Sequence, residues 1–438
     1  MESITFSYAD CLIQEEKILE AAEKITPEIE NMRNAVSKGY DDERASINLP
    51  DDKNLVRTIK ETVKEKHRLK PEYLIVVGTG GSNLGIIAVQ EAILGRLYNQ
   101  LNPTTKVLYA DTVDTDYINN IISVVEPTLK KGGNVIVNGI SKSGTTTETI
   151  ANFELMLNLL RKYKKKYEDF VVVTSDKESK LWALAVQKGF NVLEIPEKVV
   201  GRYSVLSAVG LFPLGLLGID LEQLLAGAKV ARDVCIRKNI EDNPAAKSAA
   251  IQYLHYLSGK NIFDLFLFSN DLESLGKWYR QLMAESLGKK FDIEGKRVNV
   301  GITPTVSIGS TDLHSMAQLY LGGPYDKFTT FVSVKKDKST LTVPKLEGYT
   351  ELVSGIQGKT FKTIMDAIFE GTKKAFRNDK RPFVEITLPD KSEHSIGQFL
   401  QFKMIETIYL GRLLNVNPFN QPSVESYKRE TRRILSQK

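Results

Sequence analysis

Short apolar runs that alternate with helical segments constrain the fold of this chain more than any other feature. The first group of runs starts at Tyr73 and reads "YLIVVG", "KVLYA", "VIVNGI", "FVVVTS" and "NVLEI". Between them lie stretches with helical spacing of apolar residues, such as "LGIIAVQEAILGRL". This alternation predicts an α/β fold with a doubly wound parallel sheet, flanked by helices on both faces. In such a sheet ligands bind at the carboxyl ends of the strands.

A second α/β unit follows a long, mostly helical connector. The expected strands are "IFDLFLFS" (262–269), "RVNVGI" (297–302), "KFTTFVSV" (327–334) and "RPFVEITL" (381–388). The chain is long enough for two or three domains. We predict five regions: an N-terminal helical segment (1–70), a first α/β domain (71–200), a helical connector (201–260), a second α/β domain (261–415) and a C-terminal helical arm (416–438).

Charge and cysteine content exclude several classes of protein. The net charge is only 59 − 54 = +5, and the basic cluster Arg161 to Asp169 is typical of a solvated helix end, not of a nucleic-acid surface. Cys11 and Cys235 lie far apart without metal-ligand spacing, which argues against a disulfide framework and a zinc site. No apolar run approaches the length of a membrane span. We expect a soluble cytoplasmic protein with neither nucleic-acid nor membrane partners.

The stretch "VIVNGISKSGTTTETIANF" breaks from an apolar run into a loop of hydroxyl and glycine residues. Free N–H groups at the start of a helix attract anions. Ser141, Ser143, Thr145, Thr146 and Thr147 would add hydroxyl donors, and Lys142 a positive charge. The pattern is therefore consistent with a phosphate site, although an ordinary helix cap uses the same residue types. The spacing is not that of a P-loop.

The first strand runs into "GTGGSNLG", which raises the possibility of a dinucleotide site. The third glycine of that motif is replaced by Asn83, and Asp111 lies further along the chain than a ribose ligand would. The glycine turn at Gly80 and Gly81, followed by Ser82, could equally let the backbone approach a sugar phosphate.

Other reactive groups occur in "VVGRYSVLSAVG", "YRQLMAESLGKK" and "GSTDLHSMAQLYLGG", which carry Arg202, Glu285 and His314. Each has an ordinary structural reading: a helix-start ion pair, a solvated carboxylate and an interior histidine. Near the carboxyl terminus, "NPFNQPSVESYKRETRR" places Gln421 and Lys428 around a proline-rich turn, or in an exposed tail.

Taken together, these motifs resemble those of the phosphoglucose isomerase family. "GTGGSNLG", "SKSGTTTE", "GRYSVLSAVG", "ESLGKK", "GSTDLHSMAQL" and "FNQPSVESYK" occur in the order found in that family and extend from about Tyr73 to Lys428. The resemblance implies two sugar-isomerase (SIS) domains with a C-terminal arm, assembled as a homodimer. It also implies conversion between glucose 6-phosphate and fructose 6-phosphate without a metal or an organic cofactor.

The resemblance further implies the roles of individual residues. The substrate contacts it implies are Gly81, Ser82, Ser141, Lys142, Ser143, Thr146, Gln281 and Gln421. Glu285 matches the general base that moves a proton between carbon 2 and carbon 1 through a cis-enediolate, and Arg202 matches the arginine that faces the charge of this intermediate. His314, contributed by the neighbouring subunit in the family, and Lys428 match the groups that open the sugar ring.

The chain departs from the family pattern at Val200, where a second glycine is usual, and at Ser423, where a glycine or alanine is usual. Neither change removes a functional group. Two alternatives stay open: an enzyme that also accepts mannose 6-phosphate, and a SIS protein that senses sugar phosphates without catalysis. A sensor would need the phosphate loop but would have no use for Glu285, Arg202, His314 and Lys428 together.

Overall fold

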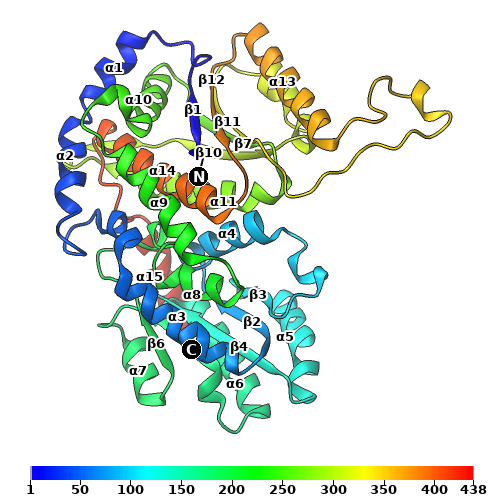
Figure 1. The fold of residues 1–438 in the computed structure, drawn as a ribbon. Helices are drawn as coiled ribbons and strands as arrows, with labels where there is room; N and C mark the ends of the chain where they lie inside the picture. The colour runs from blue at the N-terminus through cyan, green and yellow to red at the C-terminus, as the bar shows by residue number, and fades with distance from the viewer. Residues whose placement is uncertain (1, 438) are drawn as a thin grey trace. The chain divides into compact units, whose positions relative to one another are not determined.

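The computed structural model describes residues 2–437, which form two compact units (Figure 1). The first unit is Glu30–Val230, and the second unit combines the chain up to Ile29 with the chain from Ala231 onward. Helices α2 (Thr26–Ala35) and α9 (Leu221–Cys235) contain the two boundaries. The five regions predicted from the sequence have other bounds and stay a prediction.

The first unit contains a fully parallel sheet with the strand order β3-β2-β4-β5-β6. The strands are β2 (Pro71–Val77), β3 (Lys106–Ala110), β4 (Asn134–Ile140), β5 (Val171–Ser175) and β6 (Asn191–Glu194). Nearly all residues of β4 and β5 are buried, as expected for strands that are covered on both faces. The predicted α/β fold with parallel sheets is confirmed.

The helices of the first unit pack in separate groups around this sheet. They are α3 (Lys53–Arg68), α4 (Leu84–Leu94), α5 (Thr115–Lys130), α6 (Thr147–Tyr163), α7 (Lys180–Lys188) and α8 (Ala208–Leu216). Helix α8 packs against α3 and α4, whereas α5 packs against α6. Asp114 caps α5 by accepting a hydrogen bond from the Tyr117 N–H (2.9 Å), and Ser179 caps α7 in the same way.

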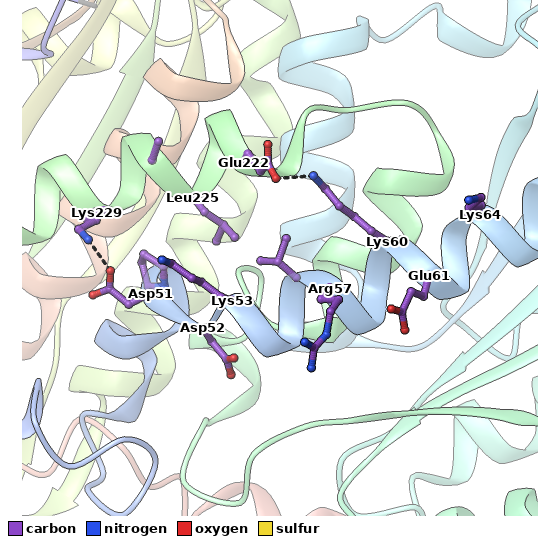
Figure 2. Close-up of a pocket in the computed structure, with 13 residues that line it drawn as sticks. Asp51, Asp52, Lys53, Arg57, Lys60, Glu61, Lys64, Glu222, Leu225 and Lys229 are labelled. Atoms are coloured by element: carbon purple, nitrogen blue, oxygen red, sulfur yellow. Dashed lines mark hydrogen bonds and ion pairs between the residues drawn. The ribbon is translucent and has the colours of Figure 1, made fainter.

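An open groove of about 650 Å³ lies between α3 and α9 in the first unit (Figure 2). Ion pairs join the two helices at Lys60–Glu222, and Lys229 pairs with Asp51 at 2.6 Å. Exposed pairs of this kind contribute little to stability. None of the residues predicted to bind or transform substrate lines this groove.

The sheet of the second unit has the strand order β1-β12-β11-β7-β10. Its strands are β1 (Thr5–Ser7), β7 (Ile262–Leu267), β10 (Thr303–Ile308), β11 (Lys327–Val334) and β12 (Phe383–Leu388). Apart from β1, which pairs antiparallel with β12, neighbouring strands are parallel. If the parallel strands of each unit are numbered along the chain, their spatial order is 2-1-3-4 in both: β10-β7-β11-β12 here and β3-β2-β4-β5 in the first unit. The two units therefore share this arrangement.

The strand expected at 297–302 is present over Arg297–Val300, but it does not belong to the main sheet of the second unit. Residues Arg297–Val300 form β9, which pairs antiparallel with β8 (Lys289–Phe291) outside the main sheet. The sheet strand is the following segment, β10, which contains Pro304. Proline is tolerated there because β10 lies at the edge of the sheet. The N-terminal segment also differs from its predicted helical character, since Thr5–Ser7 forms strand β1.

The second unit contains an aromatic core to which α12 and α13 contribute. Its helices are α1 (Glu15–Glu23), α10 (Pro244–Leu257), α11 (Glu273–Leu287), α12 (Ala317–Gly322), α13 (Phe361–Asn378), α14 (Glu393–Leu413) and α15 (Val424–Ser436). Phe331 of β11 lies at the centre of the core, with its ring centroid 5.0 Å from that of Phe376 and 5.1 Å from that of Phe383. Helix α14 is buried along almost its whole length. Within residues 2–437, no helix is both long and apolar enough to cross a bilayer.

A buried carboxyl group lies in β7 of the second unit. Asp264 Oδ1 accepts hydrogen bonds from Thr305 Oγ1 (2.7 Å), Ser307 Oγ (3.0 Å) and the Tyr320 hydroxyl (3.0 Å). Its Oδ2 is buried and has no hydrogen-bond partner among the described residues. Burial raises the pKa of Asp264 to about 6, against the effect of the three hydroxyl donors.

This carboxyl group should make stability depend on pH. Because its pKa in the folded state lies above the unfolded value, the folded chain takes up a proton between about pH 6 and pH 4 that the unfolded chain does not. The free energy of unfolding relative to Asp264→Asn should therefore rise by roughly 1 kcal/mol as pH falls from about 7.5 to about 5. Urea titrations of both proteins would measure this difference; a difference that stays constant with pH would contradict the assignment.

Candidate active site

The strand order of the first unit creates a topological switch point between β2 and β4. The chain continues from β2 to β3 on one side and from β4 to β5 on the other. Loops at the carboxyl ends of two such strands leave a crevice that binds ligands in open α/β sheets. The glycine turn follows β2, and the hydroxyl loop follows β4. Both predicted binding loops therefore begin at the position where this fold binds ligands.

The hydroxyl loop is held in shape by its own side chains. The buried Ser141 hydroxyl accepts a hydrogen bond from the Gly144 N–H (3.1 Å) and lies 3.2 Å from Thr146 Oγ1. The Ser175 hydroxyl donates to the Ser141 carbonyl at 2.6 Å, which ties the loop to β5. Gly144 has φ +65°, a conformation that favours glycine. The loop is therefore preorganised.

This loop leads into α6, whose amino end can receive an anion. Thr146 is the N-cap residue, but its side chain makes no capping hydrogen bond. The first N–H groups of a helix lack intrahelical partners and carry partial positive charge. Lys142 Nζ donates to the Glu197 carbonyl, and burial lowers the pKa of this lysine. The arrangement supplies hydroxyls, amides and an ammonium group within one short segment.

The glycine turn lies directly against the loop that carries Arg202. A Cβ atom on Gly81 would come within 2.3 Å of the Gly201 carbonyl carbon and 2.7 Å of the Arg202 nitrogen. The Ser204 hydroxyl bridges the two loops, since it donates to the Gly201 carbonyl (2.7 Å) and lies 3.4 Å from the Gly81 carbonyl. The first unit thus brings Gly81 and buried Arg202 together. Asp111, considered above as a ribose ligand, instead accepts a hydrogen bond from Asn83 (2.8 Å).

In the second unit, α11 carries a carboxylate and an amide on one face. Gln281 Nε2 donates to Glu285 Oε1 at 3.1 Å, as i, i+4 spacing on a helix allows. Gln281 Oε1 is buried and has no hydrogen-bond partner among the described residues. Buried polar atoms are rarely left unsatisfied in native proteins, so this oxygen is a candidate acceptor for a ligand hydroxyl.

Lys289 connects this helix to the turn before Gln421 and was missed by the sequence analysis. Its buried ammonium group donates to the carbonyls of Glu285 and Asn420, each at 2.6 Å. This places the carboxyl end of α11 next to the "NPFNQPS" turn. The only hint in the sequence was a lysine four residues after Glu285.

His314 and Lys428 lie in more exposed surroundings. The Asp312 carboxylate accepts from the Ile308 N–H (2.7 Å) and from the Ser315 hydroxyl (2.8 Å), which fixes the turn that presents His314 to solvent. His314 follows the single 3₁₀ turn Thr311–Leu313 and precedes α12. Lys428, on α15, pairs with Glu425 (2.9 Å). Within residues 2–437, neither residue makes a hydrogen bond or ion pair with Glu285.

Comparison with known proteins agrees with this architecture. Residues 54–438 match the family model of phosphoglucose isomerase. The chain belongs to the phosphoglucose isomerase family.

Curated relatives of this phosphoglucose isomerase family member extend over nearly the whole chain. Glucose-6-phosphate isomerase of Carboxydothermus hydrogenoformans is 33% identical, covering 97% of this chain and 92% of its own. The enzyme of the same name from Rubrobacter xylanophilus is 33% identical over 98% of both chains.

Two solved structures show the same fold. A hypothetical protein from Thermus thermophilus has a TM-score of 0.86 and 30% identity, covering 99% of this chain and all of its own. A glucose-6-phosphate isomerase from Chlamydia trachomatis, only 19% identical, has a TM-score of 0.83 over 99% of this chain and 89% of its own.

The contact between the glycine turn and the arginine loop can be tested with two alanine variants. In Gly81→Ala the new Cβ would clash with backbone atoms of Gly201 and Arg202, which cannot move aside as a flexible side chain could. We therefore expect the free energy of unfolding to fall by roughly 1–3 kcal/mol. Gly201→Ala is the matched control, because its Cβ meets only the Gly81 Cα at 3.8 Å. Urea titrations that show equal stability for the two variants would contradict the close approach of these loops.

Proposed function

We propose that this protein interconverts glucose 6-phosphate and fructose 6-phosphate. The observation that carries the proposal is the Glu285 carboxylate on α11, held by Gln281 and by the contact of its backbone with Lys289, in a chain of the phosphoglucose isomerase family. A carboxylate on a rigid helix can remove a proton and return it to a neighbouring carbon on the same face of the substrate.

The proposed reaction has several steps, and different residues act in each of them. Lys428 and His314 move protons between the ring oxygen and the carbon 1 hydroxyl, so that the sugar ring opens to a free carbonyl. Glu285 then removes the proton from carbon 2, and the electron pair moves to the carbonyl oxygen at carbon 1, which gives a cis-enediolate. Return of the proton to carbon 1 and transfer of the hydroxyl proton from the carbon 2 oxygen to the carbon 1 oxygen give the ketose. Arg202 stabilises the enediolate without changing its own protonation state.

The substrate phosphate binds to the hydroxyl loop in this proposal. Ser141, Ser143 and Thr146 offer hydroxyls, Lys142 offers its charge, and the first turn of α6 offers N–H groups. Gly81 and Ser82 lie at the neighbouring strand end, where the backbone can contact the sugar. Gln281 and Gln421 supply amides that position the substrate hydroxyls.

The same proposal includes a homodimer and a cytoplasmic location. Residues 335–360, between β11 and α13, extend away from the sheet of their unit (Figure 1). This arm exposes large apolar side chains, namely Leu341, Leu346, Tyr349, Leu352 and Val353. Such a cluster on a projecting segment favours contact with a second copy of the chain. Two free, buried cysteines suit a reducing compartment.

The function is tested by a coupled assay with purified protein, fructose 6-phosphate and a chelator. We expect glucose 6-phosphate to form at an undiminished rate with the chelator present. Mannose 6-phosphate as a second substrate would show whether the enediolate can be reprotonated on its other face. A folded protein that binds sugar phosphates without converting them would instead be a sensor.

Glu285→Gln keeps the shape of the side chain but removes the base. Turnover should fall by at least a factor of about 10², while the Michaelis constant stays within about twofold, because the missing interaction acts in the transition state. Steady-state kinetics with fructose 6-phosphate would measure both parameters. Unchanged turnover would rule out Glu285 as the base.

The phosphate assignment predicts the opposite pattern for Lys142→Ala combined with Ser143→Ala. Loss of these contacts should raise the Michaelis constant by about tenfold or more and affect turnover less, because binding of the phosphate remains the same through the reaction. Lys162→Ala is the control, because it removes a positive charge at the opposite end of α6, where Lys162 pairs with Glu126 (2.9 Å). Equal Michaelis constants for the double variant and the parent would place the phosphate elsewhere.

If His314 acts across a dimer, two inactive variants should complement each other. Glu285→Gln and His314→Ala subunits, mixed under conditions that allow exchange, would form heterodimers in which one site keeps both groups. We expect about a quarter of the parental activity at equal mixing, because half of the dimers are mixed and each has one intact site. No recovery despite proven subunit exchange would place both residues in the site of one subunit.

A further inference from the structure

A buried polar network lies behind the helix that carries Glu285. Glu406 of α14 has no exposed surface, and Tyr279 of α11 donates its hydroxyl proton to Glu406 Oε1 at 2.7 Å. Lys403 Nζ donates to both Glu406 oxygens (2.7 and 2.9 Å), and the Ser248 hydroxyl of α10 donates to Oε2 (2.7 Å). The carboxylate is thus fully hydrogen-bonded in the interior of the second unit.

Tyr279 links this network directly to α11. Lys403 also lies over the Tyr279 ring, with its Nζ 4.2 Å from the ring centroid. The Tyr279 side chain is therefore fixed by two contacts, one of its ring with Lys403 and one of its hydroxyl with Glu406. Burial raises the pKa of Tyr279 well above its usual value, which keeps the hydroxyl a donor. Such buried pairs contribute little net stability, and their known use is to fix one arrangement of packed elements.

Helical geometry relates this bond to the proposed base. Tyr279 and Gln281 are two residues apart, hence about 200° apart around the axis, and Glu285 lies another turn beyond Gln281 on the same face. Tyr279 therefore points toward the buried network, whereas Gln281 and Glu285 lie on the opposite face of α11. On a neighbouring side of α11, a Cβ on Gly276 would come within 2.5 Å of Val306 Cγ1, which shows how closely the helix packs against β10.

We propose that Glu406, through Tyr279, is a positioning residue for Glu285: the directional bond fixes the rotation and axial position of α11 and thereby the reach of the base. This inference rests on the isomerase function proposed above. Close packing at Gly276 sets how near α11 lies to the sheet, whereas apolar contacts allow small rotations. The bond from Tyr279 to Glu406 removes that freedom. A displacement of about 1 Å at a catalytic group can cost about a hundredfold in rate.

The test compares Tyr279→Phe with Tyr409→Phe. Both variants delete one buried hydroxyl, but the Tyr409 hydroxyl donates to the Cys235 carbonyl (2.8 Å) and does not reach Glu406. We expect turnover to fall about tenfold or more in Tyr279→Phe, with the Michaelis constant for fructose 6-phosphate within about twofold of the parent. Tyr409→Phe, with a similar loss of stability, should keep parental turnover.

A second readout follows the proton itself. With glucose 6-phosphate deuterated at carbon 2, the fraction of deuterium found at carbon 1 of the product measures how fast the base returns the proton relative to exchange with solvent. This fraction should fall in Tyr279→Phe and remain parental in Tyr409→Phe. A role in stability alone would leave the fraction unchanged in both, and that result would overturn the proposal.

If Tyr279→Phe does not fold, Lys403→Met combined with Glu406→Met removes the acceptor while leaving Tyr279 in place. Replacement of a buried ion pair by apolar residues of similar size is often neutral for stability. We expect the same loss of turnover and of deuterium transfer. An inactive parent would reject the isomerase function itself, whereas an active parent with unaffected Tyr279 and Glu406 variants would reject only the positioning role.

Discussion

The direction of a parallel strand decides where this molecule can do chemistry. Parallel strands need crossover connections, and the sheet interior is covered on both faces, so polar loops gather at the carboxyl edge. In the first unit the chain turns to opposite sides after β2 and β4, which leaves the glycine turn and the hydroxyl loop together at that edge. The second unit repeats the strand order, and α11 follows β7 there as α4 follows β2 in the first unit.

The proposed site residues at these edges are positioned by hydrogen bonds and close contacts with neighbouring loops and helices. Ser141 and Thr146 shape the hydroxyl loop through hydrogen bonds within it, and Gly81 permits the Arg202 loop to approach. In the second unit, Glu406 holds α11 through Tyr279, while Lys289 binds the end of the same helix to the turn before Gln421. Rigid placement is what proton transfer between adjacent carbons requires, because the base must reach both without large motion.

Much of the fold was predictable because β4 and β5 are short, mostly apolar runs, which are typical of strands buried on both faces of a sheet. The strand at Thr303–Ile308 was not, because Pro304 suggests a strand end unless the strand is known to lie at an edge. For the site, ordered motifs indicated Glu285 and Arg202, and their roles stay predictions. Lys289 and Glu406 could not be found, because the burial of a charged side chain depends on neighbours distant in sequence.

Removal of a carbon-bound proton by Glu285 is the central step of the proposed reaction, and proton NMR in heavy water observes that step without a coupling enzyme. Fructose 6-phosphate incubated with the protein should exchange one hydrogen at carbon 1 for deuterium, because in a fraction of the turnovers the protonated base exchanges its proton with solvent before the enediolate collapses. With Glu285→Gln that still binds the sugar phosphate, this exchange should fall by about 10² or more. Exchange at the parental rate in the variant would contradict the account.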